Sequence, residues 1–233
     1  MLILAIETTG PLASCALSDG IHTEQIINHT EYSHLEEIVP MVKKLLEEQS
    51  VKPEELDAIA VSRGPGSFTG IRIGVATAKG LAQVWNKPII TVPTLESFAY
   101  GKEQGDVVIA PLFDARRSQV YSGVYEPQNR NPVVEDAAYS IEELMEKIRA
   151  VKEKYDFIVF FGDGIKVYKD HLPECGIPYE IAHDEDLYQM ASSDARLAEE
   201  LYREGCLKDC YTCQPEYLRL AEAERKLKEK QNA

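Results

Sequence analysis

A glycine-rich segment, residues 62–82, holds the residues whose types and spacing could do chemistry: SRGPGSFTGIRIGVATAKGLA. Its glycines and proline are accompanied by the hydroxyls of Ser67 and Thr69. Such a segment could cradle a phosphate, activate a serine nucleophile, or let another element pack very closely. These three alternatives predict different proteins, so the spacing of the residues must be compared with each.

The spacing fits neither of the common phosphate-binding motifs. A P-loop has G-x-x-x-x-G-K-[ST], in which the lysine reaches the phosphates, but Ile71 follows Gly70 here. The dinucleotide motif G-x-G-x-x-G starts with Gly64 and Gly66 but has Thr69 in its last position. A looser anion site at the N-terminus of the following helix stays open, because free N–H groups point outward there.

The spacing around Ser67 also differs from that of a serine nucleophile. The nucleophile elbow is G-x-S-x-G, and here Pro65 and Thr69 occupy the glycine positions. The two hydroxyls, Ser67 and Thr69, are instead typical of helix caps.

Small residues recur every four positions in this segment, at Gly70, Gly74, Ala78 and Ala82. On a helix this spacing forms one stripe. Each glycine costs about 1 kcal/mol relative to alanine inside a helix, so close packing is the expected gain. The stripe could pack on the sheet of its own domain or against a helix of another subunit, and the residues alone leave both open.

The composition limits the class of protein. The chain has 233 residues, enough for one large or two small domains, and no apolar run of about 18 residues that would span a membrane. The start, MLILAIETTG, lacks the basic region of a signal peptide, and the five cysteines are an odd number. We therefore expect a cytoplasmic chain with reduced thiols. The net charge of −14 makes this chain alone a poor ligand for RNA.

Hydrophobic patterning predicts a mixed-sheet α/β protein in which one element order occurs twice. Three strands at residues 2–9, 13–18 and 21–30 are followed by a helix with apolar positions from Leu35 to Leu46 and a strand at 57–62. The order recurs with strands at 107–115, 119–125 and 132–139, a helix beginning after Ser140, and a strand at 157–161. Both helices begin with a capping-box sequence, at Ser33 and Ser140. We expect a first lobe of residues 1–102 plus about 206–233, a second lobe of 103–205, and a charged helix over 217–230.

The metal-ligating residue types form no strong pattern. Cys206, Cys210 and Cys213 have the C-x-x-x-C-x-x-C spacing of an iron–sulfur motif but lie near the C-terminus. Zinc binding with His183 as a fourth ligand is an alternative, and free thiols in a linker are the favoured interpretation. The histidines form no H-x-x-x-H or H-E-x-x-H motif, and His34 is expected on the surface or in a loop.

Four segments resemble the TsaB (YeaZ) family: LAIETT, DAIAVSRGPGSFTGIRIGVATAKGLA, DARRSQVY and YLRLAEAE. The resemblance extends from the first strand to the last helix. It implies the two-lobed, duplicated actin-like (ASKHA) fold of the catalytic subunit TsaD. It also implies a non-catalytic, cytoplasmic partner subunit that supports transfer of threonylcarbamoyl to the adenosine next to the tRNA anticodon. Such a chain would pair with TsaD, the pair would bind the ATPase TsaE, tRNA would be met only through the complex, and the chain alone would form a homodimer.

The resemblance further implies that the interface uses the helix after the GPGSFTG loop, which favours docking of the stripe against another subunit. A swap such as Gly74→Leu should then prevent pairing while leaving the monomer folded. The residues predicted to form the partner or dimer interface are Gly66, Phe68, Gly70, Ile71, Arg72, Gly74, Val75, Ala78, Lys79 and Ala82.

The family comparison also predicts loss of catalysis. TsaD binds its metal with an H-x-x-x-H motif after a strand, and Thr94 and Phe98 occupy the matching positions here. Neither side chain can replace imidazole as a metal ligand, so we expect no metal and no cofactor in the isolated chain. A metallopeptidase would lack ligands for the same reason.

Nucleotide binding stays open at this stage. In the actin-like fold the first hairpin grips phosphates, and Glu7 replaces the usual aspartate in IETTGPLAS. A small-molecule kinase using Glu7 and Asp114 is the alternative function. The candidate contacts for ATP or ADP, weakly bound or shared with the partner, are Thr8, Thr9, Arg116 and Arg117.

Overall fold

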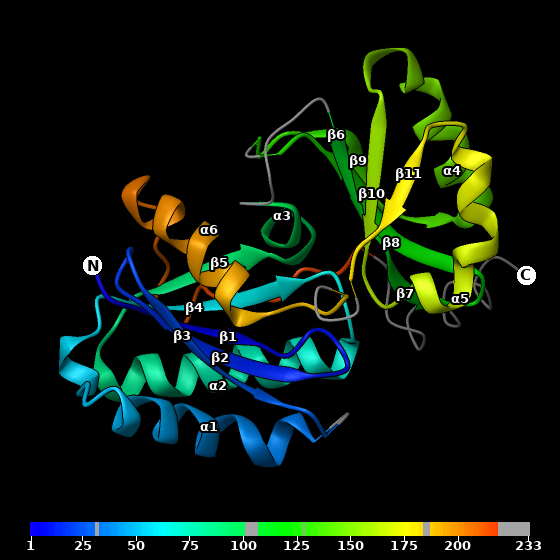
Figure 1. Cartoon of the computed structure of the whole chain (residues 1–233). Helices are drawn as coiled ribbons and strands as arrows, with labels where there is room; N and C mark the ends of the chain where they lie inside the picture. The colour runs from blue at the N-terminus through cyan, green and yellow to red at the C-terminus, as the bar shows by residue number, and fades with distance from the viewer. Residues whose placement is uncertain (31–32, 101–106, 128, 184–186, 219–233) are drawn as a thin grey trace, which may run out of the picture.

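The computed structural model describes residues 1–30, 33–100, 107–127, 129–183 and 187–218 and has two lobes, each built on one mixed sheet (Figure 1). The helix expected over 217–230 lies almost wholly outside the described residues. None of the described helices is both long enough and apolar enough to cross a membrane.

The first lobe contains a five-stranded sheet in the order β3-β2-β1-β4-β5. Its elements are β1 (Ile3–Glu7), β2 (Ala13–Ser18), β3 (Thr23–Asn28), α1 (His34–Glu48), β4 (Ala58–Gly64), α2 (Phe68–Trp85), β5 (Ile89–Pro93) and α3 (Thr94–Ala99). The central strand β1 is antiparallel to β2 and parallel to β4.

Helices cover both faces of this sheet, with α1 and α2 below and α3 and α6 (Ala191–Arg203) above in Figure 1. Successive residues of β1 therefore face different helices. Leu4 packs in the core between the sheet and helices α1 and α2, whereas Ile3 and Ala5 pack against α6. This two-sided burial explains why β1 and β4 are apolar without alternation.

The second lobe repeats the same topology. Its elements are β6 (Val107–Pro111), β7 (Phe113–Arg116), β8 (Gln119–Tyr125), β9 (Pro132–Ser140), α4 (Ile141–Ala150), β10 (Phe157–Phe161), α5 (Ile165–Tyr168) and β11 (Tyr179–Ile181). The path β9-β8-β6-β10-β11 matches β3-β2-β1-β4-β5 in order and in strand direction. The predicted duplication is confirmed, with β7 added beside β8.

Helix α6 belongs to the first lobe, although its residues follow the second. Ala191, Ala195 and Ala198 form its buried face and pack against Ile3 and Ala5 of β1. These small side chains let the helix lie close to the sheet. The chain thus returns to the first lobe at α6, earlier than residue 206, where the sequence placed that return.

One of the two predicted capping boxes is present in part. The Ser140 hydroxyl accepts a hydrogen bond from the amide of Glu143 at 3.1 Å at the start of α4. At the start of α1, Ser33 makes no side-chain cap and donates instead to the carbonyl of Thr30 at 2.9 Å. The predicted cap at Ser33 is therefore wrong, because its hydroxyl donates to the Thr30 carbonyl instead.

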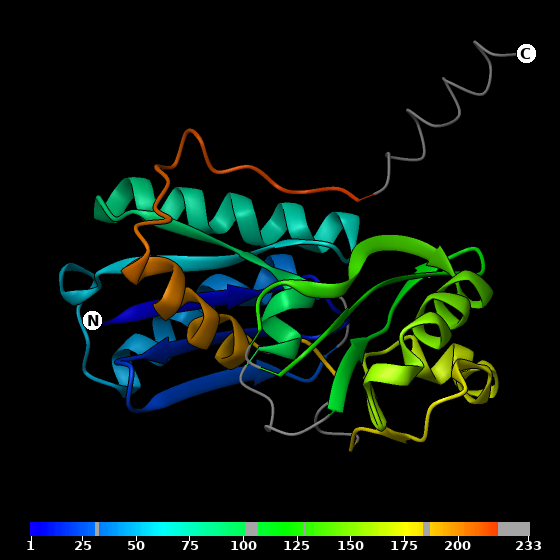
Figure 2. The same ribbon diagram turned by 90° about the horizontal axis from the view of Figure 1, so that it is seen from above.

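The segment 206–218, named here the C-terminal strap, runs along α2 after α6 (Figure 2). Its backbone pairs with that of Ile89 through Lys208, with both bonds at 2.8 Å. Further on, the amide of Glu216 donates to the carbonyl of Arg63 at 2.8 Å, and the two side chains form an ion pair at 2.6 Å. The strap therefore fastens to the first sheet at two separate points, the edge strand β5 and the end of β4.

Candidate docking site and interlobe cleft

The small-residue stripe of α2 faces the sheet of its own lobe. A Cβ added to Gly70 would overlap the carbonyl oxygen of Thr8, and one added to Gly74 would overlap the Thr8 hydroxyl. That hydroxyl donates to the carbonyl of Gly70 at 2.8 Å, so helix and strand are in direct contact. Ala78 and Ala82 are buried in the same core. The prediction that this stripe docks a partner is therefore wrong: its packing is internal.

The other predicted interface residues divide into two groups. Ile71 and Val75 are buried in the core of the lobe, and Gly66 is held against Thr9. Phe68, Arg72 and Lys79 are accessible and contact the C-terminal strap, as described next. Most of the predicted interface residues therefore lie on the inner side of α2.

Accessible residues of α2 hold the strap in place. The rings of Phe68 and Tyr217 pack with centroids 5.0 Å apart. The guanidinium of Arg72 lies 3.8 Å from the Phe68 ring centroid, and its Nε donates to the Tyr217 hydroxyl at 2.9 Å. Lys79 Nζ donates to the carbonyl of Cys213 at 3.2 Å. These contacts anchor the strap along one flank of α2.

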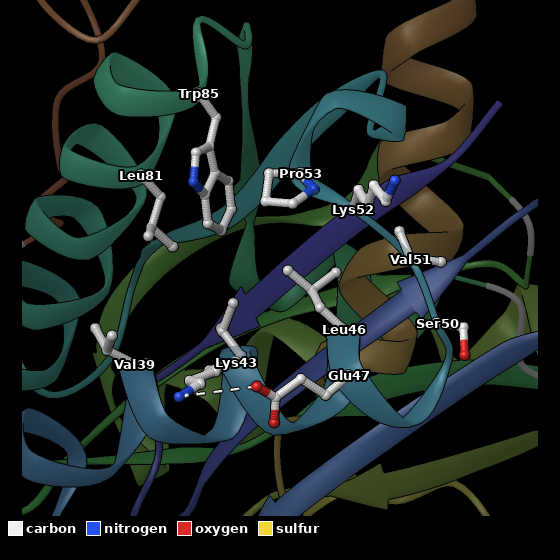
Figure 3. A pocket seen from close by; sticks show the side chains of 11 residues that line it. Val39, Lys43, Leu46, Glu47, Ser50, Val51, Lys52, Pro53, Leu81 and Trp85 are labelled. Atoms are coloured by element: carbon white, nitrogen blue, oxygen red, sulfur yellow. Dashed lines mark ion pairs between the residues drawn. The ribbon is translucent and has the colours of Figure 1, made fainter.

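A groove of about 440 Å³ lies between α1 and α2 (Figure 3). Leu81 and Trp85 project from α2, and Val39 and Leu46 lie on α1 across from them. At the rim, Lys43 and Glu47 form an exposed ion pair of 3.7 Å. Further lining comes from Val42, Ser50, Val51, Lys52 and Pro53. The groove is therefore apolar inside with charged groups at its edge, the usual anatomy of a protein interface.

Exposed apolar side chains extend beyond this groove. Val84 of α2 is 80% exposed, and Leu35 and Val39 of α1 are 74% and 49% exposed. Ala76 and Gly80 are also exposed, and nothing lies within 4 Å of where a Cβ on Gly80 would be. Ala76, Gly80 and Val84, named here the outer row, repeat the spacing of four on the accessible side of α2. In the sequence, this accessible side of α2 is marked by the outer row, which lies two positions out of phase with the buried small-residue stripe.

Between the lobes lies a second, more polar cavity of about 370 Å³, named here the interlobe cleft. Of the candidate nucleotide contacts, Thr9 and Arg116 line it, whereas Thr8 uses its hydroxyl on Gly70. Arg117 is exposed at the next position of the turn that carries Arg116. The cleft lining comprises Thr9, Gly10, Pro11, Gly66, Ser67, Phe68, Thr69, Phe113, Asp114, Ala115, Arg116, Tyr121, Asp163 and Gln189.

Glu7 is not available to this cleft, because its side chain is fully buried. Its carboxylate accepts a hydrogen bond from the amide of Thr9 and contacts the hydroxyl of Ser62. The same hydroxyl lies 2.6 Å from Oδ2 of Asp194, which is also buried. Burial, and then the charge of Glu7, raises the pKa of Asp194 well above its ordinary value. This arrangement removes the acid that a kinase would use to hold a metal.

Thr94 and Phe98, which the sequence resemblance aligned with metal-ligand positions, are part of the core. Thr94 is buried at the start of α3, and Phe98 packs edge-on against Phe113 and Phe161 at 5.5 Å between the lobes. His34 is buried rather than on the surface, and its Nε2 lies 2.9 Å from the carbonyl oxygen of Gly10.

The three C-terminal cysteines differ in environment: Cys206 is exposed, Cys210 is half-buried and Cys213 is buried. Among the described residues there is no group of three or more His, Cys, Asp or Glu side chains that could hold a metal ion.

Two duplicated lobes around a polar cleft define a protein of the actin-like (ASKHA) class. Comparison with known proteins identifies the family. The chain is 34% identical to the tRNA threonylcarbamoyladenosine biosynthesis protein TsaB of Bacillus subtilis, covering 99% of this chain and 100% of that protein. It is 30% identical to TsaB of Escherichia coli, with 97% and 98% covered. The chain belongs to the TsaB (YeaZ) family.

Solved structures and a family profile agree with this assignment. A Pseudomonas aeruginosa protein, described as similar to peptidase YEAZ, superposes with a TM-score of 0.79 at 28% identity, covering 94% of this chain and 99% of that one. Residues 19–227 match the profile of TsaD, tRNA N6-adenosine threonylcarbamoyltransferase. A transferase of that name from Thermomicrobium roseum is 36% identical over 117 residues, which are 43% of this chain and 32% of that protein.

Proposed function

We propose that this chain is a non-catalytic partner subunit in the biosynthesis of threonylcarbamoyladenosine in tRNA, and that it docks TsaD through the α1–α2 face. The observation that carries this proposal is the apolar groove between α1 and α2 together with the exposed outer row. Apolar patches of this kind on a soluble protein mark surfaces that another protein covers. Among the described residues, this face combines a groove, a charged rim and a helix row of small side chains.

The expected partner follows from the relationship between the two proteins. Because this chain matches the TsaD profile over residues 19–227, TsaD has elements that correspond to α1 and α2. Two related faces can pack about a pseudo-twofold axis, as identical faces do in an isologous dimer. The homodimer of the chain alone would then use the same face, and TsaD would compete with it. TsaE, an ATPase, would bind the resulting pair.

The non-catalytic role is supported by the site residues. Thr94 and Phe98 are buried at the positions of the TsaD histidines, and Glu7 is fully buried beside Asp194. The net charge of −14 opposes direct contact with tRNA, so tRNA would be met through the complex, in the cytoplasm.

The proposal is tested with Val84→Asp, which places a charge on the exposed outer row without touching the core. Val84 is 80% exposed, so the variant should remain folded, whereas a desolvated and unpaired carboxylate at the interface should weaken binding of TsaD at least about tenfold. Calorimetric titration with TsaD and reconstituted tRNA modification are the measurements.

The matched control is Val167→Asp on α5 of the second lobe, where the valine is 59% exposed. This variant should bind TsaD and support modification as the unmodified chain does. If Val84→Asp pairs with TsaD normally while circular dichroism shows both variants folded, the α1–α2 face is not the docking site.

A further inference from the structure

The C-terminal strap contains a C-x-x-C sequence, CYTC at residues 210–213, which the proposed function does not use. This spacing is typical either of metal ligands or of a dithiol that is oxidised and reduced reversibly. Among the described residues, no three His, Cys, Asp or Glu side chains lie close enough together to hold a metal ion. The two thiols are therefore examined as a redox pair.

Asp209 fixes these four residues in a single helical turn. Its Oδ1 accepts hydrogen bonds from the amides of Tyr211 at 2.8 Å and Thr212 at 2.7 Å. Its carbonyl oxygen accepts from the amide of Cys213 at 3.1 Å, and a bond between residues four apart closes one turn of α-helix. Cys210 and Cys213 thus stand three positions apart on one turn, where Cβ atoms lie about 5–6 Å from each other.

The two cysteines pack on the same side of this turn. Cys213 is fully buried in the apolar cluster between the first sheet and helices α1 and α2, and Cys210 packs against the same cluster. A disulfide needs Cβ atoms about 3.8 Å apart, so the turn must tighten by about 1–2 Å to form one. Tyr211 is 76% exposed and Thr212 is exposed, so the turn can tighten without moving core side chains.

Cys206 differs from this pair in its surroundings. It is exposed, and its Sγ lies 3.9 Å from Oε2 of Glu204. Lys208, midway between Cys206 and Cys210 in the chain, is fastened to Ile89 by two backbone hydrogen bonds of 2.8 Å. Cys206 is therefore held outside the turn and serves as an internal reference for an accessible thiol.

Exposure and charge give the two thiols of the turn different roles. Cys210 is partly exposed, whereas Cys213 has no exposed surface. Burial raises the pKa of the Cys213 thiol, and the positive charges of Lys79 and Lys208 offset part of that rise. Because the thiolate is the attacking species, Cys210 is suited to react with a reagent from solution and Cys213 with the sulfur beside it.

We propose that Cys210 and Cys213 form a reversible dithiol–disulfide pair that exchanges with low-molecular-weight disulfides. The Cys210 thiolate attacks one sulfur of the small disulfide, forms a mixed disulfide with it and releases one thiolate. Cys213 then gives its proton to solvent, and its sulfur attacks Sγ of Cys210 and releases the second thiolate. Two cysteine thiols are thus oxidised by two electrons, and one small disulfide is reduced to two thiols.

The position of the pair connects it to α2. Lys79 of α2 donates to the carbonyl of Cys213 at 3.2 Å, so tightening of the turn would move the group that Lys79 holds. Intracellular disulfides are usually transient and catalytic or redox-sensing, which agrees with a reversible pair in a chain of otherwise reduced thiols. The proposal does not depend on docking of TsaD at the α1–α2 face.

The test is incubation of the folded, reduced full chain with increasing glutathione disulfide at fixed glutathione. Iodoacetamide in urea then labels every remaining thiol, and trypsin digestion with mass spectrometry locates the labels. Trypsin cleaves after Arg203, Lys208 and Arg219, so Cys206 falls in one peptide and the proposed pair in the next. The variants are Cys210→Ser and Cys213→Ser, and the matched control is Cys206→Ser.

The disulfide between Cys210 and Cys213 should be half-formed at a glutathione disulfide concentration at least about tenfold lower than that which glutathionylates half of Cys206, because its second step is intramolecular. Cys213→Ser should accumulate glutathione on Cys210, and Cys210→Ser should leave Cys213 unmodified. Cys206→Ser should form the disulfide as the unmodified chain does, and dithiothreitol should restore both thiols.

The unmodified chain alone can overturn the proposal, so the result does not depend on the folding of the variants. Free thiols at both Cys210 and Cys213 under conditions that glutathionylate Cys206 would contradict it, as would a disulfide that forms only in urea. Loss of the disulfide in Cys206→Ser, with circular dichroism showing that variant folded, would assign the bond to Cys206 instead.

Discussion

The buried pair of Glu7 and Asp194 predicts an unusual pH dependence of stability. The Ser62 hydroxyl lies within hydrogen-bond distance of both carboxyl groups but has a single hydrogen to donate. One of the two acids must therefore carry a proton, and the raised pKa of Asp194 assigns the proton to that residue. Replacement by asparagine keeps a neutral group of the same shape that can donate to its neighbours.

The direction of this pH dependence follows from the protonation of Asp194 in the folded and unfolded states. An aspartate in the unfolded chain, with its ordinary pKa of about 3.9, loses its proton above about pH 4, whereas the folded protein holds it until the pH passes the raised pKa. The contribution of Asp194 is thus fully present at low pH and is lost as the pH rises. Over that window the free energy of unfolding should fall by up to about 1.4 kcal/mol per pH unit for this one proton.

The assay is urea denaturation from pH 5 to pH 9 for the unmodified chain and for Asp194→Asn. Asp136 and Asp163, whose pKa values burial raises to about 6, contribute a fall of the same sign in both proteins, so the difference between the two curves isolates Asp194. Asp194→Asn should gain stability relative to the unmodified chain as the pH rises. Glu200→Gln, on the same helix but partly accessible, should keep the unmodified slope. Parallel curves for Asp194→Asn and the unmodified chain would refute the shared proton.

Three further outcomes test the packing. Gly74→Leu should lower the free energy of unfolding by several kcal/mol because its side chain overlaps Thr8, whereas Gly80→Leu should raise it by about 0.5–1 kcal/mol; urea denaturation measures both. Ser140→Ala should cost about 1 kcal/mol in the same assay, through loss of the α4 cap. At pH 8, iodoacetamide should label exposed Cys206 in the native protein but leave Cys15, whose pKa burial raises to about 12, unmodified until denaturation, as read by mass spectrometry.

Much of the fold could be predicted because a strand that is buried on both faces of its sheet is apolar at successive positions. β1 and β4 are apolar throughout, the meanders are punctuated by turns, and the same order recurs after residue 107. The position of α6 could not be predicted in this way. Its alanine face fits either sheet, and only the close approach to Ile3 and Ala5 decides which sheet it covers.

The helix α2 could be predicted from the sequence, but which of its sides faces the sheet could not. α2 carries two rows of small residues, Gly70–Gly74–Ala78–Ala82 and Ala76–Gly80–Val84, and a spacing of four does not say which row faces inward. The contact of Thr8 with Gly70 and Gly74, between residues more than sixty positions apart, makes that choice.

The interlobe cleft depends even more on tertiary contacts. Arg116, Arg117 and Ser118 adopt the left-handed region without glycine or asparagine, so no turn signal marks them. The pairing of Glu7 with Asp194 likewise joins residues from opposite ends of the chain. Sequence patterns report local preference, and these sites form only after the lobes have assembled.

The C-terminal strap connects two regions that the rest of the chain keeps separate. Tyr217 rests on Phe68 at the start of α2, while Leu218, the next residue, packs into the apolar cluster shared by the lobes, beside Phe98 and Phe113. A rotation of one lobe relative to the other would therefore displace Tyr217 from Phe68 of α2, the helix that we propose for docking. Binding of a partner to α2 and rotation of the two lobes would then be coupled through the strap.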